Sequence, residues 1–242
     1  MNFLINAFNT LLYQPLFNAL ILLYEYLPGH DFGVAVIVLT ILLRLLLYPL
    51  MAQAIRSQKT LADLQPKIQE AKERFKDNQE RQMKEIMSLY KDKKINPFGM
   101  FLPILIQLPV LIALFWVFKN GLQSEEITML YSFVPHPGQI NYLFLGLINL
   151  SQVNIPIAVL TSITQFFQLK TQNPKPRTQK KEKKDSMSYF SQASKKQMPY
   201  FFSAFTFIFL LKLPAAIALY WMVTSLFSII QQHVLNNYDR SK

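Results

Sequence analysis

The sequence predicts an all-α, polytopic membrane protein in which five transmembrane helices surround an inward-open hydrophilic groove, together with a cytoplasmic helical hairpin and an N-terminal interfacial helix. Three observations predict this fold. Of the 242 residues, 51% are hydrophobic and only 16% are charged. Several apolar runs are long enough to cross a bilayer core of about 30 Å, and polar residues recur at helical spacing within them. The net charge of +11 is therefore concentrated between the apolar runs, unlike the charge of a soluble nucleic-acid-binding domain.

Five helices are predicted to span the membrane. The last two come from one stretch of 38 residues, which would form a helix of about 57 Å and is too long for a single crossing. Lys212 and Pro214 lie near the middle of that stretch and divide it in two. The predicted spans are residues 32–55, 97–118, 155–169, 198–213 and 214–235.

Two segments are predicted to lie on the outer side of the membrane. Residues 1–27 mix apolar residues with asparagine and glutamine and contain no lysine or arginine. This pattern favours an amphipathic helix at the outer face of the membrane, with an uncleaved signal-anchor as the alternative. Residues 119–154 are expected to form an outer loop whose later part approaches the membrane interface before the third span.

Two basic segments and a short tail complete the chain. Residues 57–94 mix ten basic with seven acidic residues and carry apolar residues at helical spacing on both sides of a turn near Asp77, which predicts a helical hairpin. The apolar positions are Leu61, Leu64, Ile68, Ala71, Phe75, Met83, Ile86, Met87 and Tyr90. Residues 170–196 have two early prolines, a run of lysines and no apolar period, which is typical of a disordered loop. Residues 236–242 form the C-terminal tail.

The basic residues also predict the topology. Of the 25 lysines and arginines, 22 fall in residues 56–96, in residues 170–196 and in the tail, which five spans place on one side. Only Lys119 and Lys212 fall on the opposite side. Because basic loops stay in the cytoplasm, we expect the N-terminus outside and the C-terminus in the cytoplasm. The sequence shows no organellar transit peptide, so we expect a bacterial plasma membrane.

Arg44 lies near the centre of the first span, roughly 16–18 Å from either end. No aspartate or glutamate lies inside any predicted span to pair with it. A charge at that depth costs about 2.5–3.5 kcal/mol on insertion scales, so such a residue is normally functional and faces water or a partner. The alternative is a packing role, in which Arg44 hydrogen-bonds only carbonyl groups or glutamine side chains.

Further polar residues share helical faces within the spans and predict, with Arg44, a hydrated groove. The groove is expected to open to the cytoplasm and to be closed outside, because the outer half of the first span is wholly apolar. A single polar stripe more often forms hydrogen bonds between packed helices, and this stays the alternative for each stripe. The predicted groove residues are Arg44, Thr40, Gln107, Thr161, Thr164, Gln165, Gln168, Trp221, Thr224, Ser225 and Ser228.

The composition argues against several other functions. The chain has no cysteine and only three scattered histidines, and its six glycines form no phosphate-binding GxxxxGK loop. We therefore expect no metal, no cofactor and no nucleotide-driven motor.

Four motifs carry a resemblance to a known family. They are VAVIVLTILLRLLLYPL at residues 34–50, LQPKIQ at 64–69, LYKDKKINPFGMFLPILIQLPVLIALF at 89–115 and LPAAIALYWMVTSLFSIIQQ at 213–232. With these motifs in this order, the chain resembles the YidC/Oxa/Alb membrane protein insertases over nearly its whole length. The resemblance implies a groove carrying an arginine, which falls on Arg44, a cytoplasmic hairpin at residues 57–94, and an apolar slide formed by the third and fifth spans.

The resemblance also implies a function and partners. A member of this family is expected to move short polar tails of nascent membrane proteins across the bilayer through the groove and to release their hydrophobic segments into lipid. The resemblance thus implies neither an enzyme activity nor a small-molecule substrate. Its expected partners are nascent membrane proteins, the lipid bilayer, the Sec translocon and the ribosome, which the basic loop and the tail would approach. Those basic segments have a second interpretation as topology determinants near anionic lipid. The alternative functions are a channel or secondary transporter with a midplane arginine, and an assembly factor that holds membrane subunits without inserting them.

Overall fold

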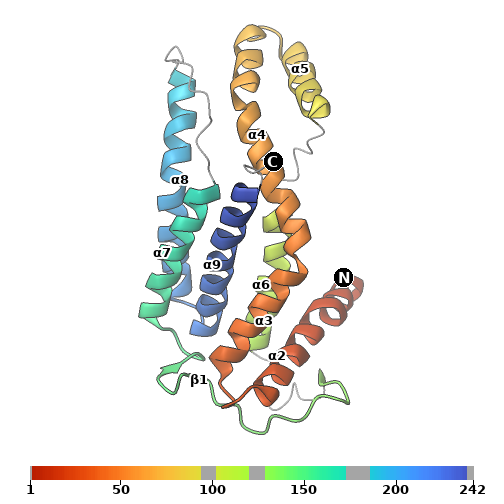
Figure 1. Cartoon of the computed structure of the whole chain (residues 1–242), viewed down its shortest axis with the longest axis vertical. Helices are drawn as coiled ribbons and strands as arrows, with labels where there is room; N and C mark the ends of the chain where they lie inside the picture. The colour runs from red at the N-terminus through yellow and green to blue at the C-terminus, as the bar shows by residue number, and fades with distance from the viewer. Residues whose placement is uncertain (1, 94–101, 120–128, 173–185, 239–242) are drawn as a thin grey trace.

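The computed structural model describes residues 2–93, 102–119, 129–172 and 186–238, and only the backbone of residues 2, 102, 104, 186–196 and 238. Within these ranges the chain is mostly helical (Figure 1). The elements are α1 (Asn2–Phe8), the π-helical segment η1 (Asn9–Tyr13), α2 (Gln14–Tyr26), α3 (Phe32–Leu46), α4 (Tyr48–Arg74), α5 (Gln79–Asp92), α6 (Leu102–Lys119), β1 (Leu143–Phe144), β2 (Ile148–Asn149), α7 (Ile155–Gln172), α8 (Ser186–Leu210) and α9 (Ala215–Tyr238).

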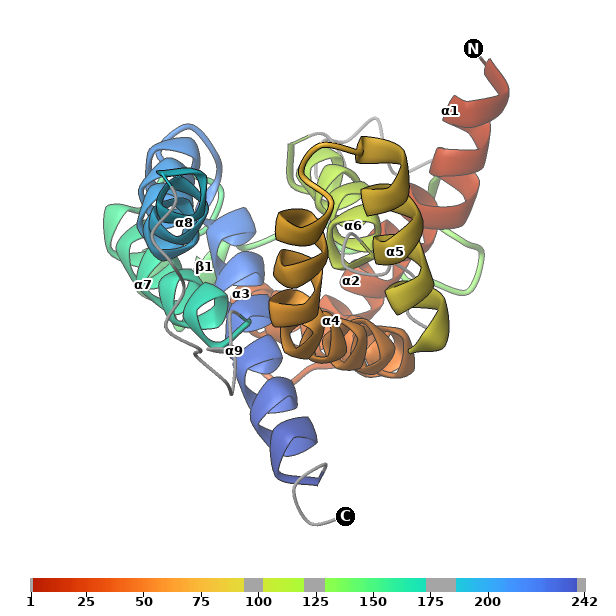
Figure 2. The same ribbon diagram turned by 90° about the horizontal axis from the view of Figure 1, so that it is seen from above.

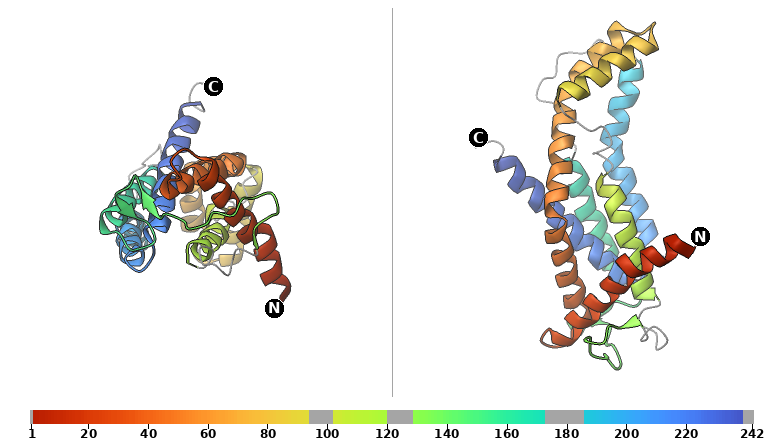
Figure 3. Two further views of the ribbon diagram at one scale, coloured as in Figure 1. Left: turned by 90° about the horizontal axis from the view of Figure 1, so that it is seen from below. Right: turned by 90° about the vertical axis from the view of Figure 1, so that its right-hand side faces the viewer.

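Helix α9 lies at the centre of the bundle. Helices α7 and α8 lie on one side of it, and α3, α4 and α6 lie on the other, as the views from the side and from above both show (Figure 1, Figure 2). The hairpin of α4 and α5 projects from one end of the bundle. The loop that carries the two strands covers the opposite end, next to the N-terminal helix (Figure 3).

The N-terminal helix runs through α1, η1 and α2 without a break. The π-helical segment ends just before Pro15, whose ring nitrogen cannot donate a helical hydrogen bond. In α2 the side chains of Phe17, Leu20 and Ile21 are fully buried in the main core, whereas Phe3 and Leu4 in α1 are exposed. The second half of residues 1–27 thus packs inside the protein, more deeply than a helix that only rests on a membrane surface. The expected position at the outer interface stays a prediction.

The first predicted span differs from a single straight helix. The carboxylate of Asp31 accepts a hydrogen bond from Val34 N and caps α3. Helix α3 then ends at Leu46, and α4 continues at an angle of 64°. The cause is Pro49, which lacks an N–H and disfavours helical geometry at the preceding residue. The expected helix over residues 32–55 is therefore α3 plus the first turns of α4.

The hairpin has its own small core. Leu64, Ile68 and Ala71 of α4 are buried against Ile86 of α5. The turn between them ends at Asn78, whose side chain accepts a hydrogen bond from Arg81 N and caps α5. Two expected core residues of α5 lie outside this contact: Met83 is 62% and Met87 44% exposed. They lie beside Ile86 on the helix, turned away from the face that meets α4. Lys94, the last residue of the expected hairpin, lies outside the described residues.

The loop before α7 contains a short antiparallel hairpin where an interfacial segment was expected. Strands β1 and β2 pair Leu143 with Asn149 and Phe144 with Ile148. The ring of Phe144 occupies the space that a Cβ atom at residue 33 would need, so the close approach of this loop to α3 depends on Gly33. Backbone N–H groups of Ala215 and Ala216 at the start of α9 donate to Gln152 O and Leu150 O. The loop is thereby fixed to α3 and α9.

The predicted disordered loop is partly helical. Residues 170–172 finish α7 and residues 186–196 begin α8, which continues as one helix through Pro199 to Leu210. The prediction was wrong for these ends because it weighed charge and prolines, whereas residues 186–197 contain no helix breaker and extend the apolar helix that follows. Residues 173–185 lie outside the described residues. Residues 211–214 separate α8 from α9, and the first residues of the expected tail extend α9 to Tyr238.

The five expected spans stay a prediction. Judged by length and apolar composition within the described ranges, one helix qualifies alone, Ala215–Asn237 in α9, and the bent pair of α3 and α4 qualifies together. The segments Leu105–Lys119 and Gln197–Leu210 are apolar but shorter. Residues 97–101 of the second expected span are not among the described residues.

Candidate functional site

Arg44 lies on α3, less than one turn before the helix ends. Its side chain is only 8% exposed. The guanidinium Nη2 donates a hydrogen bond to Oε1 of Gln107 in α6, at 3.3 Å. Among the described residues no aspartate or glutamate forms an ion pair with Arg44. The positive charge is therefore buried against a neutral amide.

Gln107 connects Arg44 to a third helix. Its Nε2 donates to the hydroxyl oxygen of Tyr220 in α9, at 2.6 Å, and Tyr220 is 3% exposed. Helices α3, α6 and α9 thus contribute one side chain each to a continuous hydrogen-bonded chain. Arg44 and Gln107 are among the residues predicted from the sequence, whereas Tyr220 is not. Its spacing gives the signal that was overlooked, because Tyr220, Thr224 and Ser228 follow each other at intervals of four on one face of α9.

Thr40 lies one turn before Arg44 on the same face of α3. Its hydroxyl donates to Val36 O at 2.6 Å, within its own helix, and the residue is 1% exposed. This bond satisfies the hydroxyl without a partner from another helix. Thr40 therefore places a small polar group next to Arg44 whose proton is already donated within α3.

The predicted stripe on α7 faces α9. The Thr161 hydroxyl lies 2.7 Å from Ile157 O and 2.9 Å from Ala218 O in α9, so its single proton is shared between the two helices. Thr164 donates to Thr161 O at 2.8 Å. Gln165 is buried and its Oε1 has no hydrogen-bond partner among the described residues. Gln168, one turn further, is half-buried.

The predicted stripe on α9 is largely buried. Ser228 donates to Thr224 O at 2.9 Å, and Trp221 is half-buried. Ser225 is fully buried, and its hydroxyl oxygen has no partner among the described residues. Gln232, one turn beyond the stripe, donates through Nε2 to Thr171 O at 2.6 Å, while its Oε1 also lacks a described partner.

The predicted residues thus fall into two groups. Arg44 and Gln107 touch directly, and Tyr220 joins them. The residues of α7 and α9 meet each other instead, through the contact of Thr161 with Ala218. Unsatisfied polar atoms in such an interface cost about 1–3 kcal/mol each unless water or a ligand reaches them. Within the described residues there is no group of three histidine, aspartate or glutamate side chains placed to hold a metal ion.

Comparison with known proteins identifies the family. The sequence model of the 60Kd inner membrane protein family matches residues 22–242. The chain belongs to this family. It is 35% identical over 209 residues to a protein of Methylobacillus flagellatus named "Membrane protein insertase YidC", a match that covers 86% of this chain and 33% of the relative.

Two further relatives with the same printed name give similar figures. The protein of Actinobacillus pleuropneumoniae is 32% identical over 92% of this chain and 36% of its own length. That of Geobacter metallireducens is 30% identical over 93% of this chain and 37% of its own length. The chain thus spans about a third of the length of these relatives.

Proposed function

We propose that this chain inserts nascent membrane proteins by drawing a short polar tail to Arg44 while the neighbouring hydrophobic segment enters lipid. One observation carries the proposal: the Arg44 guanidinium is buried against the neutral side chain of Gln107. A positive charge that no carboxylate of the described residues neutralises, in surroundings of low polarity, attracts negative charge far more strongly than it would in water. An acidic or polar tail of a client protein offers such charge.

The route to Arg44 is a hydrated groove that opens to the cytoplasm between α3, α6, α7 and α9. The buried oxygens of Gln165, Ser225 and Gln232 without described partners support water in this region. A polar tail that enters such a groove exchanges bulk water for bound water and hydrogen-bonding side chains, so the stretch of hydrocarbon that it must cross becomes shorter.

The hydrophobic segment of the client follows a separate, lipid-facing path. Helix α7 exposes Val159, Ile163 and Phe167 at intervals of four residues, and α9 exposes an equivalent stripe. That second stripe consists of Leu226, Ile230 and Val234. A client segment can pack along these apolar stripes and then partition into lipid, driven by its own hydrophobic free energy. The step needs neither nucleotide nor cofactor, and the protein acts as a chaperone rather than an enzyme.

The proposed topology places the N-terminus outside and the C-terminus in the cytoplasm of a bacterial plasma membrane, with five spans. The hairpin of α4 and α5 then projects into the cytoplasm. There its basic residues, with those of residues 170–196 and the tail, approach the ribosome through phosphate charge. For clients with several spans, the partner is the Sec translocon.

Reconstitution tests the proposal. The purified chain in liposomes is offered a single-span substrate synthesised on ribosomes, whose N-terminal tail is acidic, and protease is added from outside. We expect the tail to become protected, whereas liposomes with the Arg44→Gln variant protect much less of it. Liposomes loaded with a small dye serve as a control, because a channel would release the dye. Absence of tail protection, or dye release without protection, would contradict the proposal.

A further inference from the structure

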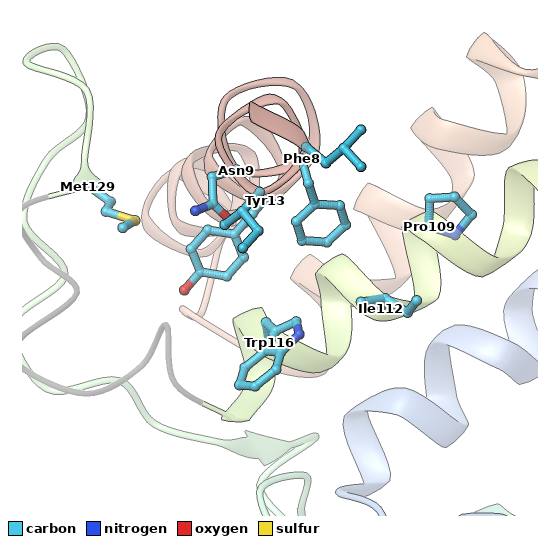
Figure 4. Close-up of a pocket in the computed structure, with 9 residues that line it drawn as sticks. Phe8, Asn9, Tyr13, Pro109, Ile112, Trp116 and Met129 are labelled. Carbon is cyan, nitrogen blue, oxygen red and sulfur yellow. The ribbon is translucent and has the colours of Figure 1, made fainter. Parts of the chain in front are cut away.

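A second candidate site lies away from Arg44, between the N-terminal helix and α6. It is a pocket of about 590 Å³. Leu4, Ile5 and Phe8 line it from one side, and Pro109, Ile112 and Trp116 line it from α6. Figure 4 shows the side chains of Phe8, Ile112 and Trp116 around one common space, with Asn9, Tyr13 and Met129 at its border. Apart from Asn9 and the Tyr13 hydroxyl, the lining is apolar.

The α6 side of the pocket ends in a positive charge. Pro109, Ile112 and Trp116 follow each other at i, i+3 and i+7, and Lys119 continues the same helical face. The Lys119 Nζ lies 5.6 Å from the centroid of the Trp116 ring. An aromatic residue and a lysine one turn apart at the end of an apolar helix are typical of the headgroup level of a bilayer.

The length of this helical face matches the thickness of the hydrocarbon layer of one leaflet. Ten residues separate Pro109 from Lys119, which corresponds to about 15 Å of helix. The hydrocarbon core of a bilayer is about 30 Å thick, so the pocket extends from the headgroup level to about the bilayer centre. An occupant with a charged end at Lys119 and an apolar body of that length fits this geometry.

The surface around the pocket is also apolar. Leu105 is 65% and Leu108 53% exposed on α6, and Leu11 is 73% exposed on the N-terminal helix. In a membrane protein such a surface faces lipid rather than water. Lipid therefore has direct access to the pocket.

We propose that this pocket binds one acyl chain of an anionic phospholipid from the outer leaflet, with the lipid phosphate at Lys119. The Asn9 amide at the pocket border is placed to hydrogen-bond the ester region. This lipid would fill the space between η1 and α6 and hold the N-terminal helix against the bundle. The inference goes beyond the insertion of clients, because it uses none of the residues around Arg44.

Quenching of tryptophan fluorescence tests the inference. The chain has two tryptophans, Trp116 and Trp221, so the Trp221→Phe variant reports on the pocket alone. This variant is reconstituted into phosphatidylcholine vesicles that contain a small fraction of a lipid with brominated acyl chains. The brominated lipid is phosphatidylglycerol in one sample and phosphatidylcholine in the other. We expect at least threefold stronger quenching by the brominated phosphatidylglycerol than by the brominated phosphatidylcholine.

Two substitutions in the same background separate the two parts of the site. Lys119→Gln should abolish the preference for phosphatidylglycerol, and Ile112→Phe, which fills the pocket, should lower quenching by both lipids. The matched control Leu108→Phe adds the same ring one turn earlier, outside the pocket, and should change neither. The Trp116→Phe variant, which reports from Trp221, should show no preference between the lipids.

Two outcomes would overturn the inference. Equal quenching of Trp116 by the two brominated lipids would exclude a specific anionic lipid. Quenching that disappears as the protein-to-lipid ratio rises, together with crosslinking between copies through a cysteine at residue 112, would assign the pocket to a second copy of the chain instead.

Discussion

Nη2 of Arg44 lies 3.3 Å from Oε1 of Gln107, and this contact joins α3 to α6 inside the bundle. Because Gln107 donates in turn to Tyr220, the orientation of its amide is fixed: the oxygen faces the guanidinium and the nitrogen faces α9. The arrangement holds Arg44 in one place with a neutral partner. It therefore positions the charge without cancelling it.

Gln107→Glu should slow the insertion of acidic tails. The new carboxylate would stand where the amide oxygen now accepts from Arg44 and would neutralise the guanidinium. A loss of 1.4 kcal/mol in attraction corresponds to roughly a tenfold effect, and we expect a reduction of about that size in the rate of tail protection in liposomes. Gln107→Met is the control, because it removes the hydrogen-bond acceptor but does not neutralise the charge of Arg44. Similar rates for both variants would contradict the electrostatic role.

Tyr220→Phe should destabilise the protein. The substitution leaves the Nε2 group of Gln107 without its acceptor in a buried position, which typically costs about 1–3 kcal/mol. Thermal unfolding in detergent measures the effect. Tyr200→Phe on α8, where the side chain is 63% exposed, is the matched control and should leave the transition unchanged. Equal shifts for both variants would show that the hydroxyl contact with Gln107 contributes nothing to stability.

Gly33→Ala should separate the outer loop from α3. The added methyl group would overlap the Phe144 ring, and overpacking of this kind costs about 1–3 kcal/mol. A double-mutant cycle with Phe144→Leu checks the cause, because the smaller side chain should recover part of the lost stability. If the two substitutions are simply additive, the contact between Gly33 and Phe144 is not the source of the loss.

Asn18→Ala should loosen the start of the outer loop. Asn18 is 3% exposed, and its side chain accepts from Tyr131 N at 2.7 Å and donates to Met129 O at 3.0 Å. Without it Tyr131 N loses this acceptor, and Met129 O keeps only the hydrogen bond from Gln14 Nε2. Limited proteolysis should therefore cut the loop after residue 129 several-fold faster. Asn6→Ala, at an exposed position of the same N-terminal helix, should leave the cleavage rate unchanged.

Periodicity in the sequence was sufficient to predict a helical protein. The polar residues within its apolar stretches included Arg44 and Gln107, which the structure joins by a hydrogen bond. The partner Tyr220 was missed, although it shares a face with Thr224 and Ser228, because tyrosine in an apolar span was counted as a hydrophobic residue. Nor could periodicity predict which stripes meet. Thr161 pairs with the backbone of Ala218, a contact that depends on how α7 crosses α9 and leaves no trace in either stripe.

The remaining differences have local causes. The bend between α3 and α4 follows from Pro49, which the count of apolar residues overlooked. The hairpin of β1 and β2 is only two residues long on each strand, and it is held by Gly33 and by Asp31, whose carboxylate accepts from Leu145 N at 2.6 Å. Strands this short are stabilised by tertiary contacts rather than by their own sequence pattern.

The most direct test of the account asks whether a client tail passes Arg44. A photo-crosslinking amino acid replaces either Gln107 or the neighbouring Leu108, whose side chain is 53% exposed on the outside of α6. A ribosome-stalled client with a reactive probe in its polar tail or in its hydrophobic segment is then offered to membranes that contain the variant. We expect position 107 to crosslink to the tail and position 108 not to. Crosslinking of the tail at 108 alone, or at neither position while insertion proceeds, would contradict it.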